Sequence, residues 1–332
     1  MNIGHQDVYQ QAYYQALHGF SRRMETELTI LLYHGVYDGS VSGIINYNGK
    51  HVPVARFRSD MRYINQHCTV LSMDEVVEIG ISGEPWPKKS VAVTFDDGFA
   101  NNHSLAAYVL ADVGVPATFY VCPGMMDTTH MFWVDQLEDC LNRSARESIN
   151  ITLDGVARTY NLKDLTHRIA ALENIKTVCK RVPVAEKTRI LKQVEEATEI
   201  EPSPDSWPHY RPASWQQIRD LADNPLFIVG GHSLYHDILA LQGRERACLD
   251  ICTSLRLLEY QLDRPIRHYS YPEGQTHHYN DEVIAALRAE GVICSPSAIV
   301  GMNQANLDLF HLRRVMVGFY GLPLPHLDPM LK

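Results

Sequence analysis

Two adjacent carboxylates, Asp96 and Asp97, directly follow the apolar run 91–95 and are followed by Gly98. An apolar run of this length predicts a buried strand, and parallel α/β folds place their catalytic groups at the carboxyl ends of such strands. Burying both carboxylates as anions would be costly unless a cation accompanied them. Asp-Asp-Gly is also a common Asx turn, so the pair alone is compatible with a metal site or with a plain strand end.

A second candidate for metal binding is the pair His232 and His236, four residues apart. This spacing puts both imidazoles on one side of a helical turn, where they can bind one ion. With 16 histidines in 332 residues, about 0.8 such pairs are expected by chance. The context strengthens the interpretation, because glycines 230–231 follow a predicted strand, and Ser233 and Asp237 could accept hydrogen bonds from the imidazoles.

Together the two segments resemble the polysaccharide-deacetylase family (NodB homology, carbohydrate esterase family 4). Residues 94–98, Thr-Phe-Asp-Asp-Gly, match its first motif, and residues 232–237, His-Ser-Leu-Tyr-His-Asp, match its second. The resemblance covers most of the chain from Leu31 onward, apart from an insertion. It implies an α/β fold of the NodB-homology type, a distorted and incomplete (β/α) barrel.

The resemblance also implies the roles of the motif residues. Asp96 would be the general base, and Asp97, His232 and His236 would bind one divalent metal ion. Two imidazoles and one carboxylate leave coordination positions open for a water and a carbonyl oxygen. Zn²⁺ is the ion we expect, with Co²⁺, Ni²⁺ and Fe²⁺ as alternatives.

The segment 269–274, Tyr-Ser-Tyr-Pro-Glu-Gly, resembles the third motif of the family. In that motif a Pro-aromatic-Gly turn offers a backbone N–H to the oxyanion. Glu273 stands in place of the aromatic residue, which changes little if only its N–H is used. We expect Tyr271 and Pro272 beside the substrate.

The family also has an arginine just upstream of the third motif that orients the base, and no arginine occupies that place here. Arg267 is near in sequence, and Arg314 resembles a late arginine of some relatives. Either could orient Asp96, and for Arg267 a solvated surface position is at least as good an interpretation.

The last motif of the family, Leu-x-His, supplies the general acid and has two candidates. His326 in the tail fits the bare spacing but is preceded by a proline, which suits a core strand poorly. His34 ends the apolar strand 28–33 and resembles the branch in which this motif opens the domain. We therefore predict that His34 is the acid, with a buried structural histidine as the alternative.

The elements around these motifs alternate between strands and helices, which predicts a parallel sheet or barrel. Gly114 closes a helix in the position of a left-handed cap, and Ser72 caps another. The expected strands are 28–33, 91–95, 117–121, 227–230 and 268–271, and the expected helices are 57–68, 73–79, 102–113, 215–222, 245–262 and 281–291.

Residues 127–212 have a different texture and interrupt the barrel domain, which we place at residues 27–332. Charged, helix-period sequence at 162–172 and 184–198 leads into a Pro-rich stretch. We interpret the segment as a mostly helical insertion or lid. Its Trp133 and Trp207 could cover one side of the cleft and stack on a sugar, or could simply pack the insertion.

Residues 1–26 read as an amphipathic helix ahead of the barrel. Packing on the domain is the plain interpretation, and contact with a membrane surface or with a second copy of the chain is the alternative.

Composition excludes several classes of protein. A net charge of −9 and no basic stripe argue against a nucleic-acid partner. Seven scattered cysteines without a CxxC pair suit reduced thiols. The N-terminus does not resemble a secretory signal, and no apolar run is long enough to cross a bilayer, so we expect a cytoplasmic protein.

The function that these residues predict is hydrolysis of an N-acetyl group on an amino sugar. The expected substrate is a compact nucleotide- or lipid-linked saccharide of surface-glycan assembly. The alternatives are a small-molecule amidase of the allantoinase type on the same fold, and a non-catalytic saccharide-binding protein.

Overall fold

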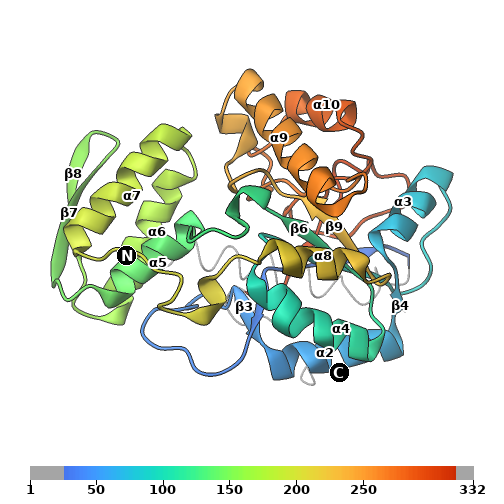
Figure 1. Cartoon of the computed structure of the whole chain (residues 1–332), viewed down its shortest axis with the longest axis horizontal. Helices are drawn as coiled ribbons and strands as arrows, with labels where there is room; N and C mark the ends of the chain where they lie inside the picture. The colour runs from blue at the N-terminus through green and yellow to red at the C-terminus, as the bar shows by residue number, and fades with distance from the viewer. Residues whose placement is uncertain (1–25, 319–332) are drawn as a thin grey trace.

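A parallel sheet forms the centre of the computed structural model, which describes residues 26–318 (Figure 1). The strand order is β10-β1-β5-β6-β9, and β4 pairs with the start of β5. The strands are β1 (Thr29–Tyr33), β4 (Thr69–Val70), β5 (Ser90–Phe95), β6 (Ala117–Val121), β9 (Phe227–Gly231) and β10 (Val315–Met316).

Isolated parallel bridges continue this sheet around a barrel. They join Gly231 to Tyr269, His268 to Cys294 and Val300 to Arg314. The predicted strand 268–271 is therefore reduced to two bridge residues. The result is the distorted, incomplete (β/α) barrel that the sequence predicted.

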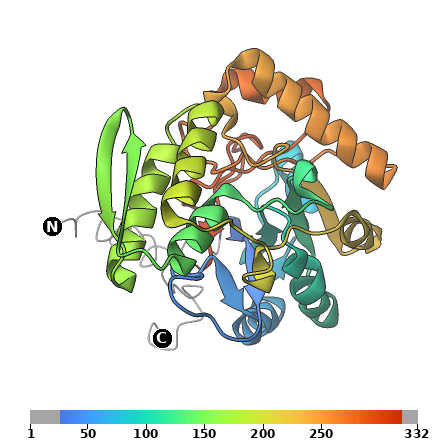
Figure 2. The same cartoon turned by 60° about the vertical axis from the view of Figure 1, so that its left-hand side comes forward.

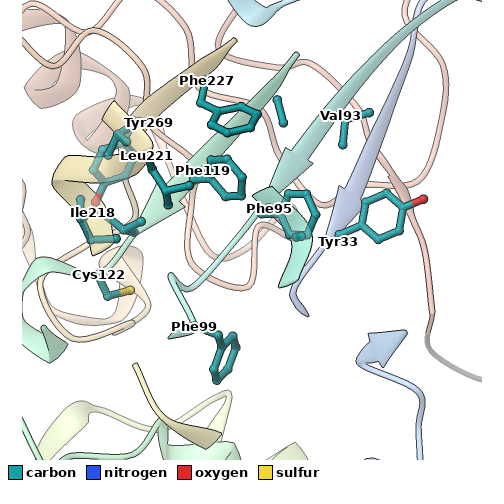
Figure 3. Packing of buried hydrophobic residues seen from close by; sticks show 14 of the residues in the cluster. Tyr33, Val93, Phe95, Phe99, Phe119, Cys122, Ile218, Leu221, Phe227 and Tyr269 are labelled. Atoms are coloured by element: carbon teal, nitrogen blue, oxygen red, sulfur yellow. The ribbon is translucent and has the colours of Figure 1, made fainter. Parts of the chain in front are cut away.

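The strands are apolar because their side chains are buried on both faces. Every residue of β1, β5 and β6 is buried, as expected when helices and loops cover both sides of a parallel sheet. Aromatic rings stack across neighbouring strands: Phe95 and Phe119 lie 5.1 Å apart, and Tyr33 and Phe95 lie 5.3 Å apart (Figure 3). This ring row fixes the strands that carry the site residues.

Helices pack around the sheet, with α2, α4 and α8 on one side and α9 and α10 on another (Figure 1). Ser72 and Ser214 start α3 and α8 with complete capping boxes. The helices of the barrel are α2 (Val54–His67), α3 (Met73–Ser82), α4 (Tyr108–Val113), α8 (Trp215–Asp223), α9 (Arg244–Leu262) and α10 (Asp281–Ala289), with short 3₁₀ turns at Pro123–Met125, Pro208–Tyr210 and Leu239–Leu241.

The predicted helix 102–113 begins irregularly. Its first part, Asn102–Ala107, is a π-helix, and only Tyr108–Val113 is α-helical. The Asn102 side chain donates a hydrogen bond to the carbonyl of His34 at 2.9 Å. Wide turns of this kind are frequent at functional sites, and this one ties the helix to the end of β1.

The segment after the barrel's fourth strand forms a separate lobe, residues 133–198, which we call the insertion lobe (Figures 1 and 2). It has its own hydrophobic cluster of buried residues, distinct from that of the barrel. Its elements are α5 (Trp133–Arg143), β7 (Ser148–Leu153), β8 (Val156–Asn161), α6 (Leu165–Cys179) and α7 (Val184–Thr198).

Beside its helices α5, α6 and α7, the lobe contains a hairpin that was not predicted, in which β7 and β8 pair antiparallel on its outer side. Asp154 and Gly155 turn the chain with φ of 52° and 74°. This Asp-Gly pair is a known turn signal between the two strands of a hairpin. A second strand pair, β2 (Gly35–Tyr37) with β3 (His51–Pro53), was also not predicted.

Two predictions fall outside the described residues. One is the N-terminal amphipathic helix over 1–26, of which only residue 26 is described, and the other is the alternative acid His326. Among residues 26–318, no helix is both long and apolar enough to cross a membrane.

Candidate active site

The site residues gather at the carboxyl ends of three strands of the parallel sheet, β1, β5 and β9. Asp96 and Asp97 follow β5, His34 follows β1, and His232 follows β9. The register pairs Tyr33 with Phe95, and the Asp96 N–H donates to the Tyr33 carbonyl at 2.9 Å. Residues far apart in the sequence are thereby brought to one edge of the sheet.

Asp97, His232 and His236 form a compact, buried group. One ligand atom from each lies within 4.8 Å of the others. Asp97 Oδ1 is 3.3 Å from His236 Nε2 and 3.6 Å from His232 Nε2. A tetrahedral ion with bonds of about 2.0–2.1 Å separates its ligands by roughly 3.4 Å, so the group has the dimensions of a zinc site.

The chemistry of the group also fits a cation. Asp97 Oδ1 is buried without a hydrogen-bond partner, and a carboxylate oxygen in that state is costly unless a cation binds it. Burial raises the pKa of the Asp97 carboxyl, but the two imidazoles and His34 outweigh this and hold the pKa well below its usual range. Asp97 is therefore an anion that faces two ring nitrogens.

The His232 ring is oriented by a backbone carbonyl. Its Nδ1 lies 2.8 Å from the Ser270 carbonyl, which only accepts, so Nδ1–H donates and Nε2 presents its lone pair to the cluster. The prediction that Ser233 or Asp237 supplies this acceptor is wrong. The Ser233 hydroxyl has no hydrogen-bond partner, and Asp237 pairs with Lys187.

The two histidines lie on a bent loop and not on the helical turn that their spacing suggested. Ser233 and His236 have φ of 61° and 60°, which non-glycine residues adopt only when surrounding contacts hold them there. The Ser233 N–H donates to the Tyr269 hydroxyl at 2.7 Å, and the next N–H donates to Asp250 at 2.9 Å. These contacts replace helical hydrogen bonds.

The imidazoles have different electrostatic surroundings. Burial lowers the pKa of His236, and Asp97 compensates only in part. Burial also lowers the pKa of His232, but Asp96 and Asp97 together outweigh it and raise the pKa. Metal binding requires the neutral ring in both cases.

Asp96 is held by Arg314. The guanidinium forms two hydrogen bonds with the carboxylate, from Nη1 to Oδ1 at 2.8 Å and from Nη2 to Oδ2 at 2.7 Å. Arg314 is 1% exposed, and it also donates to Ser270 and to the Ser297 carbonyl. Arg267, the other candidate, is exposed. Burial raises the Asp96 pKa, but Arg314 outweighs this and lowers it, so Asp96 is ionised.

His34 is half-buried at the end of β1, beside the carboxylates. Burial lowers the pKa of its imidazole to about 4, although the charges of Asp97 and Asp96 act in the opposite direction. β1 pairs with β5, and Tyr33 lies opposite Phe95, so His34 and the two carboxylates follow neighbouring strand ends.

The third motif forms a turn, as predicted, but the Tyr271 ring within it is not exposed to a ligand. The Tyr271 ring stacks on Tyr279 at 3.9 Å, its hydroxyl donates to the Phe310 carbonyl at 3.0 Å, and Pro272 is also buried. The predicted substrate contact of Tyr271 is therefore wrong, because the ring is used in packing. Glu273 follows with φ of 61°.

Trp133 and Trp207 are also used in packing. Trp133 is 6% exposed in the cluster of the insertion lobe, and Trp207 is 5% exposed against Tyr210 and its neighbours. Neither indole presents a face for sugar stacking, so the prediction of an aromatic lid is wrong. The apolar area of each ring is better buried against other side chains than left in water.

Lys50 lies beside the site and was not among the predicted site residues. Its ammonium pairs with Asp135 of α5 and lies 4.8 Å from the centre of the Phe99 ring. Burial lowers the Lys50 pKa, but Asp135 and Asp97 outweigh this and raise it. A charged lysine thus adjoins the site from a Gly-rich turn region, where no sequence pattern marked it.

The fold and the site together define a class. A parallel barrel of this kind, with a buried Asp-His-His group and an Arg-held aspartate at its carboxyl edge, is the arrangement of NodB-type deacetylases. The family model described as polysaccharide deacetylase matches residues 83–294, well over half of the chain. The chain therefore belongs to the polysaccharide deacetylase family.

Similar proteins agree with this assignment. The chain is 25% identical over 114 residues to YxkH of Bacillus subtilis (strain 168), whose name places it with the polysaccharide deacetylases. That match spans 34% of this chain and only 38% of YxkH.

Solved structures share the fold at low identity. The Streptococcus pyogenes deacetylase PplD, in complex with acetate, matches with a TM-score of 0.59 at 16% identity, covering 92% of this chain and 96% of PplD. IcaB from Ammonifex degensii matches with a TM-score of 0.57 at 17% identity, covering 88% of this chain and 92% of IcaB.

Proposed function

We propose that this protein is a metal-dependent N-deacetylase that hydrolyses the acetamide of an amino sugar. The observation that carries the proposal is the buried group of Asp97, His232 and His236 beside the Asp96–Arg314 pair. Membership of the polysaccharide deacetylase family supports it.

Asp97, His232 and His236 would hold one divalent ion, Zn²⁺ or a related ion such as Co²⁺, Ni²⁺ or Fe²⁺. When bound, the ion would polarise the amide carbonyl and make a water more acidic. The Ser270 carbonyl keeps the His232 ring in the orientation that this role needs.

Asp96 is the proposed base. It takes one proton from the attacking water, whose oxygen forms the new bond to the amide carbon. The Arg314 guanidinium fixes the carboxylate, and the Glu273 backbone N–H is the proposed donor to the oxyanion. The carbon–nitrogen bond then breaks, releasing acetate and the amine.

His34 is the proposed proton donor to the leaving amine. With a pKa of about 4, its imidazole is neutral at pH 7, so the proton must reach it during the reaction. The proton that Asp96 takes from water is the available source, and its transfer through His34 to the amine nitrogen balances the reaction.

The proposed substrate is a compact N-acetylated amino sugar carried by a nucleotide or a lipid, inside the cell. All seven cysteines are free thiols, in keeping with a reducing compartment. Trp133 and Trp207 are buried, so they do not form an aromatic lid that would favour a compact substrate.

Acetate release from a panel of N-acetyl amino sugars, paired with metal analysis of the same protein, tests the function. The panel should include chitin oligomers, nucleotide- and lipid-linked donors, and a ureide for the amidase alternative. We expect metal-dependent release from the short amino-sugar donors. Turnover of long oligomers alone would contradict the substrate, and release from none of the amino sugars would contradict the function.

A further inference from the structure

Lysine–carboxylate pairs join the insertion lobe to the edge of the barrel that carries the candidate site. Each crosses from an element of the lobe to a segment of the barrel. They are Lys50 with Asp135, Lys180 with Glu273, and Lys187 with Asp237.

The pair of Lys180 and Glu273 reaches the third-motif turn. Lys180 caps the C-terminus of α6, and its Nζ lies 2.6 Å from Glu273 Oε2. Glu273 has φ of 61°, a conformation that needs support from its surroundings. The next residue, Gly274, is anchored on the barrel side, because its carbonyl accepts from the Ala298 N–H at 2.9 Å.

The pair of Lys187 and Asp237 reaches the histidine loop. Asp237 directly follows His236, and Lys187 lies in the first turns of α7, with its ammonium 5.6 Å from the centre of the Trp133 ring. Trp133 belongs to the lobe's own hydrophobic cluster. The packing of the lobe thus holds a cation against the residue after a proposed metal ligand.

The burial of these groups separates them from ordinary surface ion pairs. The side chain of Glu273 is 12% exposed and that of Lys180 is 35% exposed, and those of Lys187 and Asp237 are 10% and 16% exposed. Exposed pairs contribute little, whereas removing one partner of a buried pair leaves an uncompensated charge. The Glu273 carboxylate therefore depends on Lys180.

Electrostatics agree with this dependence. Burial raises the Glu273 pKa, but Lys180 and His236 outweigh it and lower the pKa to about 2. The carboxylate is thus an anion at neutral pH, and the lobe supplies its lysine partner.

We propose that Lys180 is a positioning residue, through which the insertion lobe fixes the Glu273 turn and its backbone N–H in the active geometry. The inference rests on the proposed deacetylase function and deepens it, because it makes the lobe part of the catalytic apparatus. Lys180 acts through Glu273 and not on the substrate.

Steady-state acetate release by full-length, Zn²⁺-loaded protein tests this inference. The variants are Lys180→Met, Lys180→Arg, Glu273→Gln and the double variant Lys180→Met/Glu273→Gln. Lys163→Met is the matched control, because it removes a lobe lysine that is 61% exposed. Metal content and the melting temperature are measured on each protein.

We expect kcat of Lys180→Met to fall between tenfold and a hundredfold, since a small displacement of an aligned group can cost that much. KM and metal content should stay near those of the unaltered protein. The melting temperature should fall only slightly, because the Lys180 side chain is 35% exposed and water can partly replace it beside Glu273. Lys180→Arg should recover most of the rate. The double variant should be no slower than the slower single variant, because both changes remove one interaction.

Unchanged kcat in Lys180→Met would overturn the inference. A rise in KM at constant kcat would also overturn it, because Lys180 would then bind substrate directly. Lys180→Met could also lose its metal, fail to fold, or show a fall in melting temperature that matches its fall in kcat. If Glu273→Gln then showed a similar loss, the Lys180–Glu273 pair would be assigned to stability alone. Absence of acetate release from the unaltered protein would instead contradict the proposed function.

Discussion

The Arg314 guanidinium and the Asp96 carboxylate are joined by two hydrogen bonds, of 2.8 and 2.7 Å, although 218 residues separate them in the sequence. The planar fork of arginine matches a carboxylate in this way, and a lysine cannot reproduce it. Both side chains are almost completely buried. The pair fixes the orientation of Asp96 and keeps it ionised.

Arg314→Lys should lower kcat by about tenfold to a hundredfold at neutral pH, because Asp96 loses its two-point contact. It should also move the acidic limb of the pH–rate profile. Arg314 lowers the Asp96 pKa, so a weaker partner lets this pKa rise, and the limb shifts to higher pH. Rate profiles from pH 4 to 9 measure the shift. If the acidic limb stayed at the same pH, Arg314 would not be the group that lowers the Asp96 pKa.

Asp96→Asn should retain the metal and lose acetate release by several orders of magnitude, since a carboxamide cannot accept the proton from water. Elemental analysis and single-turnover acetate release give the two quantities. The amide oxygen can still accept one of the two hydrogen bonds from Arg314, and the melting temperature shows whether the variant folds. Substantial turnover by this variant would remove Asp96 from the role of base.

His34→Gln should lower kcat by about a hundredfold to a thousandfold without loss of metal, because proton transfer to the amine contributes about this much. The effect should shrink for an aryl acetate ester such as p-nitrophenyl acetate, because its phenolate leaving group is a weak base and departs without a proton. Comparing the two substrates measures the difference. Equal losses on both would indicate that His34 is a structural histidine.

Glu138 offers a prediction on stability. It accepts hydrogen bonds from the Tyr210 hydroxyl and the Asn46 N–H, and burial with the charge of Asp135 raises its pKa to about 7. The folded state therefore holds this proton more tightly than the unfolded state, and the stability that it contributes is lost as the pH rises from about 4.5 to about 7.

Glu138→Gln keeps an acceptor oxygen and removes the charge. At pH 8 the variant should be more stable than the unaltered protein by on the order of 1–3 kcal/mol, and the gain should shrink towards pH 5. Urea unfolding at both values tests this, with the exposed Glu147→Gln as control. A variant that is less stable at pH 8 would contradict the assignment.

The central strands and the positions of the site residues could be predicted because the barrel repeats one simple pattern. Apolar runs become buried strands, and polar residues follow where the strands end, as at Phe95 and Asp96. The strands Thr29–Tyr33, Ser90–Phe95 and Ala117–Val121 lie within a residue of the predicted bounds. The local order of apolar and polar residues is therefore enough to predict where these strands begin and end.

The contacts between distant segments could not be predicted in this way. The partner of Asp96 stayed open between two arginines, because only the tertiary fold buries Arg314 and leaves Arg267 exposed. Tyr271 and Trp133 were expected to face a ligand, but whether an aromatic ring packs or binds depends on what lies against it. The lysine pairs of the lobe are long-range in the same sense.

The central claim is that Asp97, His232 and His236 hold one catalytic metal ion. The most direct measurement is acetate release by chelator-stripped protein during titration with Zn²⁺, together with metal analysis of a His232→Ala/His236→Ala variant. The account predicts almost no release before zinc is added, full activity at one equivalent, and no stoichiometric metal in the variant. Full acetate release by the stripped protein, or one retained equivalent of metal in the variant, would contradict it.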